Sequence, residues 1–568
     1  MNSAAVEKNL PIHPAIAEHL GYLGISSGAD TQRFMFPSLQ DLPSPTFLKY
    51  IDTAVELVIE AIENSHDILI WGDYDVDGIT AASLLVLFFK DLGVEAICHI
   101  PDRLTEGYGL NADRLREFSI KLSEKKILIT VDCGIGNGDE IKLARRYGFK
   151  TIVTDHHLVP EVGPYADAVI NPKQEGCTFP FKHLAGVGVA FYLAAAIRSK
   201  MIEKNLISID NKINLKWFLG LVAIGTIADI MPLNGVNRLL VKAGFESIAE
   251  HRQKGIQELF TELDISSTMI SSESISFRVA PAINAAGRLG NPSVPLELFT
   301  SASEVTAKKR AAELVRLNNK RKSICEEEYE KALTKISKSL IYVNKSIVVL
   351  DDFHEGVLGI IASRLVETFA VPALVCCYHP LDKSVVKGSA RAPDGFDLYG
   401  AISKSAHYLN SFGGHEAAAG FSLRAENYLE FKQSFETLNS AYNYIIVNND
   451  SNLKNILIEL SVSEALNQQL LDNLIRLEPT GEGNPKPIFV DRSANFVSHS
   501  FIGQNRSHLK GTIRGKYGNI SVIGFNLAKN AKEIDFGRPC TISYIHSLDY
   551  YNGRSQWKIH LRDIRQNG

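Results

Sequence analysis

The chain has 568 residues, of which 45% are hydrophobic and 22% are charged, and its formal net charge is −4. This composition is that of an ordinary soluble globular protein, and the length predicts about three or four domains. The charge excludes a chain that is basic over its whole surface, as many nucleic-acid-binding proteins are, but it leaves room for a local basic groove.

The cysteines and the N-terminal residues indicate the cellular compartment of the protein. Seven cysteines occur without a C-x-x-C pair, which fits a reducing cytoplasm better than a disulfide framework or a zinc site. The first residues lack a charged segment followed by an apolar core, so we expect no signal peptide. The longest apolar run, 217–231, contains Asp229 and is shorter than the about 20 residues that a membrane span needs. We therefore expect a cytoplasmic protein without a membrane segment.

The hydrophobic pattern predicts an α/β architecture that begins after a lead-in of residues 1–45, which we expect to pack on the first domain. From residue 46 to about 235, short apolar strands alternate with helical segments, and the strands are expected at 68–71, 96–100, 126–131 and 150–154. Two-sided apolar strands separated by helices favour a parallel sheet with helices on both faces.

Chemically capable side chains follow all four predicted strands. The first is followed by Asp73, Asp75 and Asp77; the others are followed by Arg103 with Tyr108, by Asp132, and by Asp155-His156-His157. Ligands of parallel sheets bind at the carboxyl ends of the strands. An acidic loop by itself could simply be solvated, but four such strand ends together predict a site.

Asp229 adds a further carboxylate at the end of an apolar helix predicted over 218–230. It could be a residue that only ends the helix, but beside the other carboxylates we interpret it as another ligand. Clustered carboxylates repel one another unless a cation compensates them, and hard cations such as Mn²⁺ or Mg²⁺ prefer oxygen ligands. Two such ions, bridged by an aspartate, would suit hydrolysis of a phosphoester or phosphoanhydride. The candidate residues are Asp73, Asp75, Asp77, Asp132, His156, His157 and Asp229.

Residues 236–345 are predicted to be mainly helical. Arg288 lies in an apolar, glycine-flanked setting that favours an anionic partner. The charged segment 302–338 is predicted to form one helix on the order of 50 Å long, which we interpret as a connector between two lobes that border a cleft.

A second α/β domain is predicted over 346–446, with three candidate phosphate-binding elements. His354 precedes a strand-to-helix turn, Ser389 and Arg391 pair a hydroxyl with a guanidinium, and His415 lies in a glycine-rich turn (413–420) that we expect to lead into a helix. Packing alone could also explain the glycine-rich turn.

Alternating strands over 453–566 predict a small β-barrel, for which an OB-fold is the natural candidate. Basic side chains interleaved with Tyr517 suit nucleic-acid backbone contact and base stacking, although a solvated basic edge would look the same; they are Arg506, His508, Lys510, Arg514 and Lys516. Neither a Walker motif nor a G-x-G-x-x-G fingerprint occurs, so nucleotide hydrolysis as an energy source is not expected.

These motifs resemble a known superfamily. Asp73-Tyr74-Asp75-Val76-Asp77-Gly78, Asp132, Asp155-His156-His157 and Asp229 resemble the four motifs of the DHH phosphoesterases, and the Gly413-Gly414-His415 region is similar to their DHHA1 domain. With the stretch 477–485 leading into an OB-like barrel, the domain order resembles the bacterial RecJ family of single-strand-specific 5′→3′ DNA exonucleases. Thr480 stands where an aromatic residue is expected from the family pattern.

The resemblance implies roles for particular residues. Two overlapping metal-ligand sets are implied, Asp75 with Asp132, and Asp77 with His156 and Asp229, with Asp132 as the bridge and with His157 and Asp73 behind the ligands or facing the substrate. A 5′-phosphate pocket is implied for Arg103, Ser389 and Arg391, base stacking for Tyr108, and phosphate contacts near the site for Arg288 and His354.

The function implied is release of 5′-mononucleotides from single-stranded DNA in recombination and mismatch repair. Single-stranded DNA-binding protein and a RecQ-type helicase are the implied partners, and we expect a monomer. Two alternatives stay open at this point: a small-substrate phosphoesterase of the same superfamily, such as a pyrophosphatase or oligonucleotide hydrolase, and a non-catalytic single-strand-binding scaffold.

Overall fold

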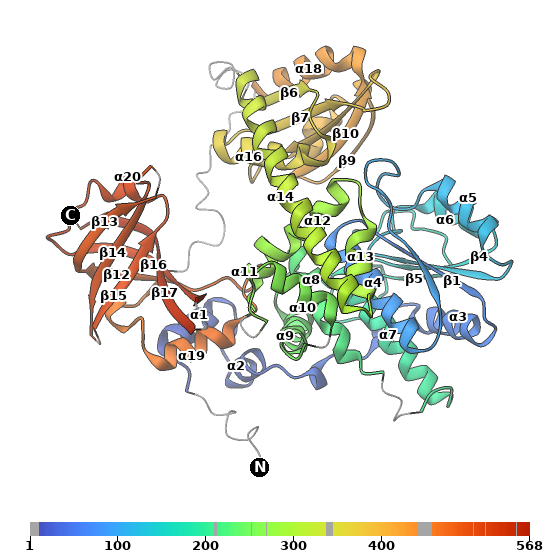
Figure 1. Cartoon of the computed structure of the whole chain (residues 1–568), viewed down its shortest axis with the longest axis horizontal. Coiled ribbons are helices and arrows are strands. Elements are labelled where there is room, and N and C mark those ends of the chain that lie inside the picture. The colour runs from blue at the N-terminus through green and yellow to red at the C-terminus, as the bar shows by residue number, and fades with distance from the viewer. Residues whose placement is uncertain are drawn as a thin grey trace. The chain divides into compact units, whose positions relative to one another are not determined.

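The computed structural model of the chain describes residues 11–208, 213–251, 253–267, 270–336, 345–440, 457–503, 505–516, 518–551 and 554–567. These residues form two compact units, shown in Figure 1. The first contains described residues within 1–99, 112–280 and 453–568, and the second contains those within 100–111 and 281–452. None of the described helices has the length and apolar character required to cross a membrane.

A parallel five-stranded sheet forms the centre of the first unit, as predicted. Its order is β2-β1-β3-β4-β5, and every neighbouring pair runs parallel. The strands are β1 Asp67–Gly72, β2 Ala96–His99, β3 Lys126–Val131, β4 Phe149–Thr154 and β5 Ala168–Ile170. The edge strand β5 was not predicted, because three residues are too few for a pattern of alternation or burial to stand out.

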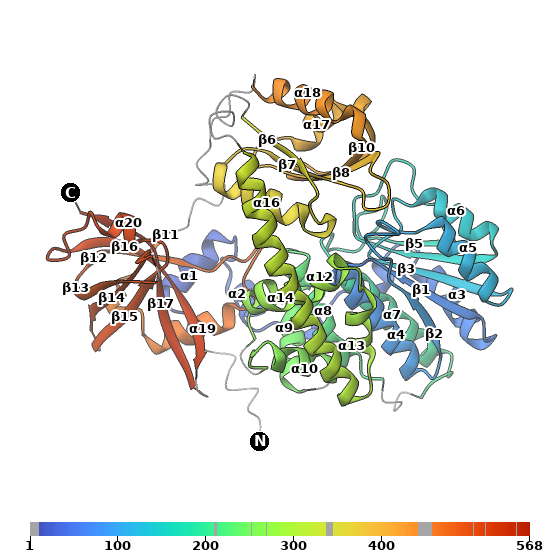
Figure 2. The ribbon, with the colours of Figure 1, turned by 45° about the horizontal axis from the view of Figure 1, so that its top comes forward.

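Helices cover both faces of this sheet, with α5 and α6 on one side and α3, α4 and α7 on the other (Figure 2). Helix α4 is buried nearly all round because it packs against β1, α7 and α8, which explains why its sequence lacks a polar face. The helices are α3 Ile51–Glu63, α4 Val76–Asp91, α5 Ala112–Lys121, α6 Gly138–Arg146, α7 Gly186–Glu203, α8 Leu219–Ala228, α9 Gly235–Ala249, α10 Lys254–Glu262 and α11 Ser272–Ser274.

The C-terminal domain, also in the first unit, is a seven-stranded mixed sheet with order β11-β12-β16-β17-β15-β14-β13. Its elements are β11 Leu457–Glu459, α19 Gln468–Leu477, β12 Ile488–Ala494, β13 Phe496–Ile502, β14 His508–Gly515, β15 Gly518–Gly524, α20 Ala528–Ala531, β16 Cys540–Tyr551 and β17 Arg554–Gln566. Strand β13 was not predicted, and its side chains are largely exposed. The predicted base-stacking residue Tyr517 lies outside the described residues, as do the predicted domain limits at 446 and 453.

The lead-in differs from expectation. Helix α1 (Pro14–Tyr22) packs on α19 and β11 of the C-terminal domain rather than on the first domain (Figure 1). Ile16 and Leu20 belong to the same buried core as Ile458 and Leu470, because the apolar face of α1 completes a core that the small sheet cannot close alone. Helix α2 (Gly28–Met35) comes next; the short turn at 39–41 then contacts α9, and the turn at 45–47 contacts α3 and α7.

The second unit contains a mixed five-stranded sheet of order β6-β7-β8-β10-β9. The long predicted helix is α14, whose Cys325, Tyr329 and Ala332 pack into the core beside β6 and α16. The elements are α12 Ala280–Arg288, α13 Ser293–Thr300, α14 Glu304–Lys335, β6 Ile347–Asp351, α16 Leu358–Phe369, β7 Ala373–Tyr378, β8 Val385–Arg391, α17 Leu398–Ser403, β9 Leu409–Gly414, β10 Ala418–Arg424 and α18 Tyr428–Ser440.

One prediction for this unit was wrong. The glycine-rich segment 413–420 does not lead into a helix but forms the turn of the β9–β10 hairpin, in which Gly414 pairs with Ala419 and Gly413 with Gly420. The run of alanines that suggested a helix continues instead as β10, where alternate residues are buried against the core. Tertiary packing therefore overrides the helical propensity of alanine here.

A single buried arginine joins three segments of the first unit. The guanidinium of Arg238, on α9, donates hydrogen bonds to the carbonyls of Phe34 (3.0 Å), Arg476 (2.8 Å), Leu477 (2.8 Å) and Pro479 (3.2 Å). It also stacks on the Phe34 ring at 3.9 Å, and burial lowers its pKa to about 9. The lead-in, α9 and the segment after α19 thus share one cation.

Replacing Arg238 by Ala should lower the free energy of unfolding of the first unit by about 3 kcal/mol, because four hydrogen bonds from a buried guanidinium and its stacking on Phe34 are lost. Scanning calorimetry would measure this. Arg33→Ala is the control, since Arg33 is exposed and its contact with Asp30 spans 3.6 Å. Equal effects of the two substitutions would contradict the role assigned to Arg238.

Candidate functional site

Carboxylates and imidazoles from four elements meet at the carboxyl edge of the first sheet. Asp73, Asp75 and Asp77 follow β1, Asp132 follows β3, His156 and His157 follow β4, and Asp229 ends α8. Asp73, Asp77, Asp132 and His156 are each at most 3% exposed. The structure therefore brings together all seven residues that the sequence singled out in this domain.

The ring of His156 points its Nε2 atom into the carboxylates. Nε2 lies 3.1 Å from Asp132 Oδ1, 3.4 Å from Asp229 Oδ2 and 3.9 Å from Asp77 Oδ2. Burial, followed by the charge of His157, lowers the pKa of His156 to about 3, so the imidazole is neutral. A neutral imidazole among carboxylate oxygens is a metal-ligand set rather than an ion pair.

The crowding and burial of the carboxylates raise their pKa values. Burial is the largest cause that raises the pKa of Asp77 and of Asp132 well above the usual range, and the neighbouring aspartates raise both further. Burial and the charge of Asp75 raise the pKa of Asp229 to about 7. Within the described residues, neither Asp132 Oδ1 nor Asp229 Oδ2 has a hydrogen-bond partner, and a divalent cation would satisfy both oxygens.

Three groups of ligand atoms each lie within 4.8 Å of one another. One combines Asp73, Asp75 and Asp132, the second Asp77, His156 and Asp229, and the third Asp132, His156 and His157. Asp132 and His156 each belong to two of the groups, so the groups overlap. The donor set of carboxylate oxygen and imidazole nitrogen fits Mn²⁺ or Mg²⁺.

Backbone geometry enforces this arrangement at two points. Asp132 has a left-handed backbone with φ 59°, which is uncommon for a residue other than glycine and turns the chain sharply after β3. At Gly78 a Cβ would lie within 2.7 Å of three backbone atoms of Asp73. Only glycine at that position lets the first turn of α4 close against the acidic loop.

The N-terminus of α7 holds one of the carboxylates. Gly186 N donates to Asp77 Oδ2 at 2.6 Å, and Val187 N donates to Asp77 Oδ1 at 2.9 Å. The positive end of the helix therefore offsets part of the cost of burying this charge. A Cβ on Gly186 would lie 2.5 Å from Asp132 Oδ1, so α7 can approach only because this residue is glycine.

Asp155 lies outside the three ligand groups and hydrogen-bonds the segment that carries His156 and His157. Its Oδ1 accepts hydrogen bonds from His156 N, His157 N and His157 Nδ1, and its Oδ2 accepts one from Ile135 N. Burial alone would lower the pKa of His157, but the hydrogen bond and charge of Asp155 outweigh it and raise that pKa to about 9. The raised pKa favours the protonated, cationic form of His157 at neutral pH.

Sequence reasoning missed Lys173, which lies near these groups. Burial lowers the pKa of Lys173, while the charges of Asp229 and Asp155 oppose that shift. Asn171 fixes the local backbone, because its side chain donates to His157 O and accepts from Lys173 N. The available signal was the polar run directly after the short apolar segment 168–170.

Four arginines of the second unit lie close enough for their charges to interact: Arg103, Arg288, Arg321 and Arg391. Burial, followed by the nearby charges of Arg103, Arg321 and Arg391, lowers the pKa of Arg288 to about 10. Burial and the charge of Arg103 also lower the pKa of Arg391. Arg321, on α14, was missed, since its segment reads as an ordinary charged helix.

The N-terminus of α16 lies against this cluster. A Cβ on Gly359 would lie 2.8 Å from Arg391 Nη2 and 3.1 Å from Ser389 Oγ, and Arg391 Nη1 donates to Ser389 Oγ at 3.1 Å. Arg288 Nη1 donates to Gly356 O at 3.1 Å. Guanidinium, hydroxyl and helix N-terminus together form a site with the chemistry of phosphate recognition.

The remaining candidates differ in their placement. His354 caps the turn before α16, where its Nδ1 accepts from Gly356 N, and a Cβ on Gly356 would lie 3.2 Å from its ring. Tyr108 is 53% exposed in the same unit as Arg103. His415 is exposed in the β9–β10 turn, and among the described residues no contact joins its side chain to the arginines.

Three family models match the chain. The DHH family, N-terminal domain, covers residues 67–226, the DHHA1 domain covers 343–441, and the RecJ OB domain covers 458–563. The three matches follow one another in the order predicted from the sequence.

Named relatives and a solved structure are similar over most of the chain. The single-stranded-DNA-specific exonuclease RecJ of Bacillus subtilis is 31% identical over 98% of this chain and 69% of the relative. The protein of the same name from Haemophilus influenzae is 33% identical over 93% of each. The crystal structure of RecJ in complex with Mn²⁺ from Thermus thermophilus matches 98% of this chain and 77% of that chain, with a TM-score of 0.79 and 28% identity.

The buried carboxylate–imidazole cluster and the parallel sheet agree with the DHH match, and the mixed C-terminal sheet agrees with the OB match. The identities exceed 30% over nearly the full length of this chain, and the relatives carry one name. This chain therefore belongs to the RecJ family of single-stranded-DNA-specific exonucleases.

Proposed function

We propose that the chain hydrolyses single-stranded DNA from the 5′ end and releases 5′-mononucleotides, using two divalent cations. The observation that carries this proposal is the position of His156 Nε2 within 3.4 Å of carboxylate oxygens of Asp132 and Asp229. Neutral imidazole and buried carboxylates in such a cluster are the ligand set of a hydrolytic metal centre.

Asp75, Asp77, Asp132, His156 and Asp229 would hold the two ions, with Asp132 shared and Asp73 beside it. Bound Mn²⁺ or Mg²⁺ would lower the pKa of a coordinated water and stabilise the charge that develops on the phosphate. Asp77 is oriented by the α7 N-terminus. His157, kept cationic by Asp155, would face a non-bridging oxygen of the substrate.

The arginine cluster would bind the 5′-phosphate. Arg103, Ser389 and Arg391 are the proposed contacts, with Arg288 and His354 beside them and Tyr108 stacking a base. Coulombic repulsion among buried guanidiniums is relieved when an anion binds, so the cluster should bind a phosphate tightly. A 5′-terminal phosphate bound there would give the enzyme its polarity.

Digestion of a 3′-labelled single-stranded oligonucleotide tests the proposal directly. With Mn²⁺ or Mg²⁺ we expect a ladder that shortens from the 5′ end, and we expect none with EDTA or on blunt duplex DNA. Cleavage of pyrophosphate or a dinucleotide, with the oligonucleotide intact, would instead favour a small-substrate phosphoesterase, and binding without hydrolysis would favour a scaffold.

The substitution Asp132→Asn should raise the thermal stability of the metal-free protein and lower its nuclease activity. Because a buried charge that repels its neighbours is removed, the thermal unfolding midpoint in EDTA should rise. Stabilisation by added Mn²⁺ should largely disappear, and the cleavage rate should fall at least about a hundredfold, the scale seen even when residues that only support metal ligands are changed.

The control for this change is Asp139→Asn on α6, whose side chain is 92% exposed. It should alter neither the unfolding midpoint nor the rate. Retention of the Mn²⁺ response by Asp132→Asn would show that Asp132 is not a bridging ligand.

Arg391→Met should abolish the preference for 5′-phosphorylated over 5′-hydroxyl substrate. The KM for phosphorylated DNA should rise by about tenfold to a hundredfold, the equivalent of one charged hydrogen bond, while the KM for 5′-hydroxyl DNA should not change. Arg424→Met, at the exposed end of β10, is the control. An equal loss on both substrates would argue against a terminal-phosphate pocket.

The family resemblance supports further proposals: a role in recombinational and mismatch repair, contacts with single-stranded DNA-binding protein and a RecQ-type helicase, and a monomeric state. Light scattering on the purified chain would test the last. Fluorescence anisotropy with each labelled partner would test the contacts, and absence of binding at micromolar concentration would remove them.

A further inference from the structure

A tight turn follows α19 and leads into β12 of the OB domain. We define residues 480–484 as the linker turn. Gly481 and Asn484 exchange backbone hydrogen bonds of 2.8 and 3.1 Å. The fully buried Asn484 side chain donates to the carbonyls of Leu477 (2.9 Å) and Pro479 (2.7 Å), so the turn is rigidly attached to the end of α19.

The linker turn contacts the loop that immediately follows Asp229. Leu233 N donates to Glu482 O at 2.7 Å. A Cβ on Gly483, whose φ is +69°, would lie 3.0 Å from Asn234 Nδ2 and 3.2 Å from Pro232 Cβ. A Cβ at Gly483 would therefore require the side chains of Asn234 and Pro232, on the loop, to give way slightly.

The loop after Asp229 has an energetically unfavourable local conformation. Asp229 places a carboxylate at the negative end of α8, where the helix dipole disfavours it. Ile230, the next residue, has φ 54°, an outlier for a β-branched side chain. Ile230 N and Met231 N close the helix end on Ile227 O and Thr226 O. Such strain persists only where surrounding contacts over-determine the conformation.

Two contacts hold this loop from outside. One is the Leu233–Glu482 hydrogen bond of the linker turn. The other is Asn237, whose buried side chain donates to Pro232 O at 3.1 Å and to His183 O at 2.6 Å. His183 precedes the α7 N-terminus that holds Asp77. Asn237 therefore contacts the segment before α7 as well as the loop after Asp229, whereas the linker turn contacts that loop.

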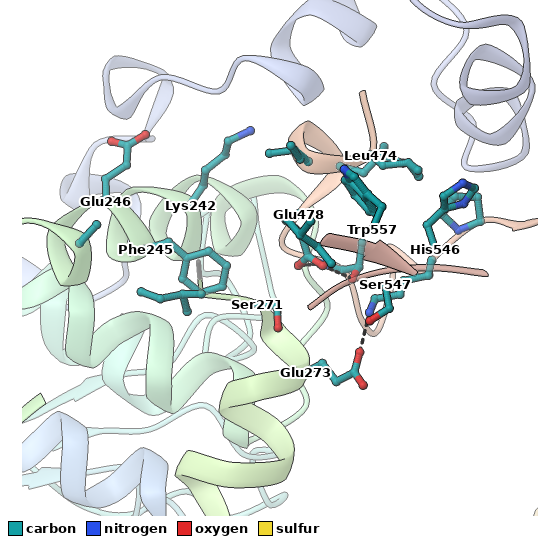
Figure 3. A pocket seen from close by; sticks show the side chains of 18 of the residues that line it. Lys242, Phe245, Glu246, Ser271, Glu273, Leu474, Glu478, His546, Ser547 and Trp557 are labelled. Carbon is teal, nitrogen blue, oxygen red and sulfur yellow. Dashed lines mark hydrogen bonds and ion pairs between the residues drawn. The ribbon is translucent and has the colours of Figure 1, made fainter. Parts of the chain in front are cut away.

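The other end of the linker turn is anchored in the OB domain. Leu477 belongs to the core of that domain. Arg238 donates hydrogen bonds to the carbonyls of residues 476, 477 and 479. Figure 3 shows Lys242 and Phe245 of α9 on one side of a cavity of about 480 Å³ and Leu474, Glu478 and Trp557 on the other. Lys486 spans the same junction, with its ammonium 2.6 Å from Glu273.

We propose that the linker turn is a positioning element for Asp229, through which the OB domain sets the geometry of one metal-ion site. This inference rests on the proposed function, since it assigns Asp229 to a bound cation. Leu477 of the OB core is hydrogen-bonded to the linker turn through Asn484, and the linker turn is hydrogen-bonded to Leu233, four residues after Asp229. Loss of the contact should weaken one ion without unfolding either domain.

The test is Gly483→Ala in the full-length protein, with Gly148→Ala as the matched control. Gly148 also has a positive φ, of +85°, and lies at the start of β4, where a Cβ would meet only Glu124 O at 3.7 Å. Isothermal titration with Mn²⁺, kcat and KM on single-stranded DNA, and the thermal unfolding midpoint would be measured for both. Asp229→Asn serves as the reference for loss of the ligand itself.

Gly483→Ala should raise the Kd of one Mn²⁺ ion by about tenfold, the effect of disturbing the residues that support a metal ligand, and should lower kcat while leaving KM unchanged. Gly148→Ala should change neither. If both substitutions lower the midpoint equally and the Mn²⁺ Kd of Gly483→Ala matches the unsubstituted protein, the linker turn is only structural. If the unsubstituted protein and Asp229→Asn bind Mn²⁺ alike, the proposed function fails instead.

A second pair covers the case in which Gly483→Ala does not fold. Leu233→Ala removes the side chain that Gly481 packs on, and Leu233→Ile keeps an apolar side chain there. We expect a weakened Mn²⁺ site in Leu233→Ala and rescue in Leu233→Ile. Unchanged Mn²⁺ affinity in Leu233→Ala would overturn the proposal.

Discussion

Repulsion among buried carboxylates is the constraint on which the first unit depends. Asp77 and Asp132 are almost fully buried, and burial together with neighbouring aspartates raises the pKa of both. A fold of marginal stability can keep such charges only if other groups hold them in place. The α7 N-terminus, the left-handed backbone at Asp132 and the support of His156 and His157 by Asp155 all answer this requirement.

The second unit presents the opposite problem. Arg288 and Arg391 are held in a cluster with Arg103 and Arg321, and the described residues place no carboxylate among the causes that perturb the pKa of either buried guanidinium. The carboxylate cluster of the first unit favours a cation as its ligand, and the arginine cluster of the second unit favours an anion.

The junction between the DHH and OB domains shows how the fold supports a strained site. Arg238, Asn484 and the linker turn join the OB core to the loop after Asp229 by hydrogen bonds to backbone carbonyls. Backbone carbonyls are strong acceptors that must be paired when buried, so these contacts are costly to break. In this arrangement the OB domain contacts the loop that follows Asp229.

Much of the architecture could be predicted from the sequence, because local patterns and local chemistry coincide. The strands β1 and β3 contain continuous apolar runs and β4 is rich in β-branched residues, and topology alone brings the residues after each strand to one edge of the sheet. The positions of Asp73, Asp75, Asp77, Asp132, His156 and His157 were therefore predictable. The segment 413–420 was not, because its alanines and glycines gave a misleading local signal and packing into β10 decided its structure. Helix α1 was misplaced for a similar reason, since its apolar face does not say which core it completes.

The sequence by itself thus determined the domain order, the parallel sheet and the identity of the residues at its carboxyl edge. Only the tertiary structure decided that His156 is neutral and His157 charged, that α7 holds Asp77, that Arg321 joins the arginines, and that the linker turn contacts the Asp229 loop. Each of these depends on contacts between residues far apart in the chain. Burial and electrostatic environment are set by such contacts, which no local pattern records.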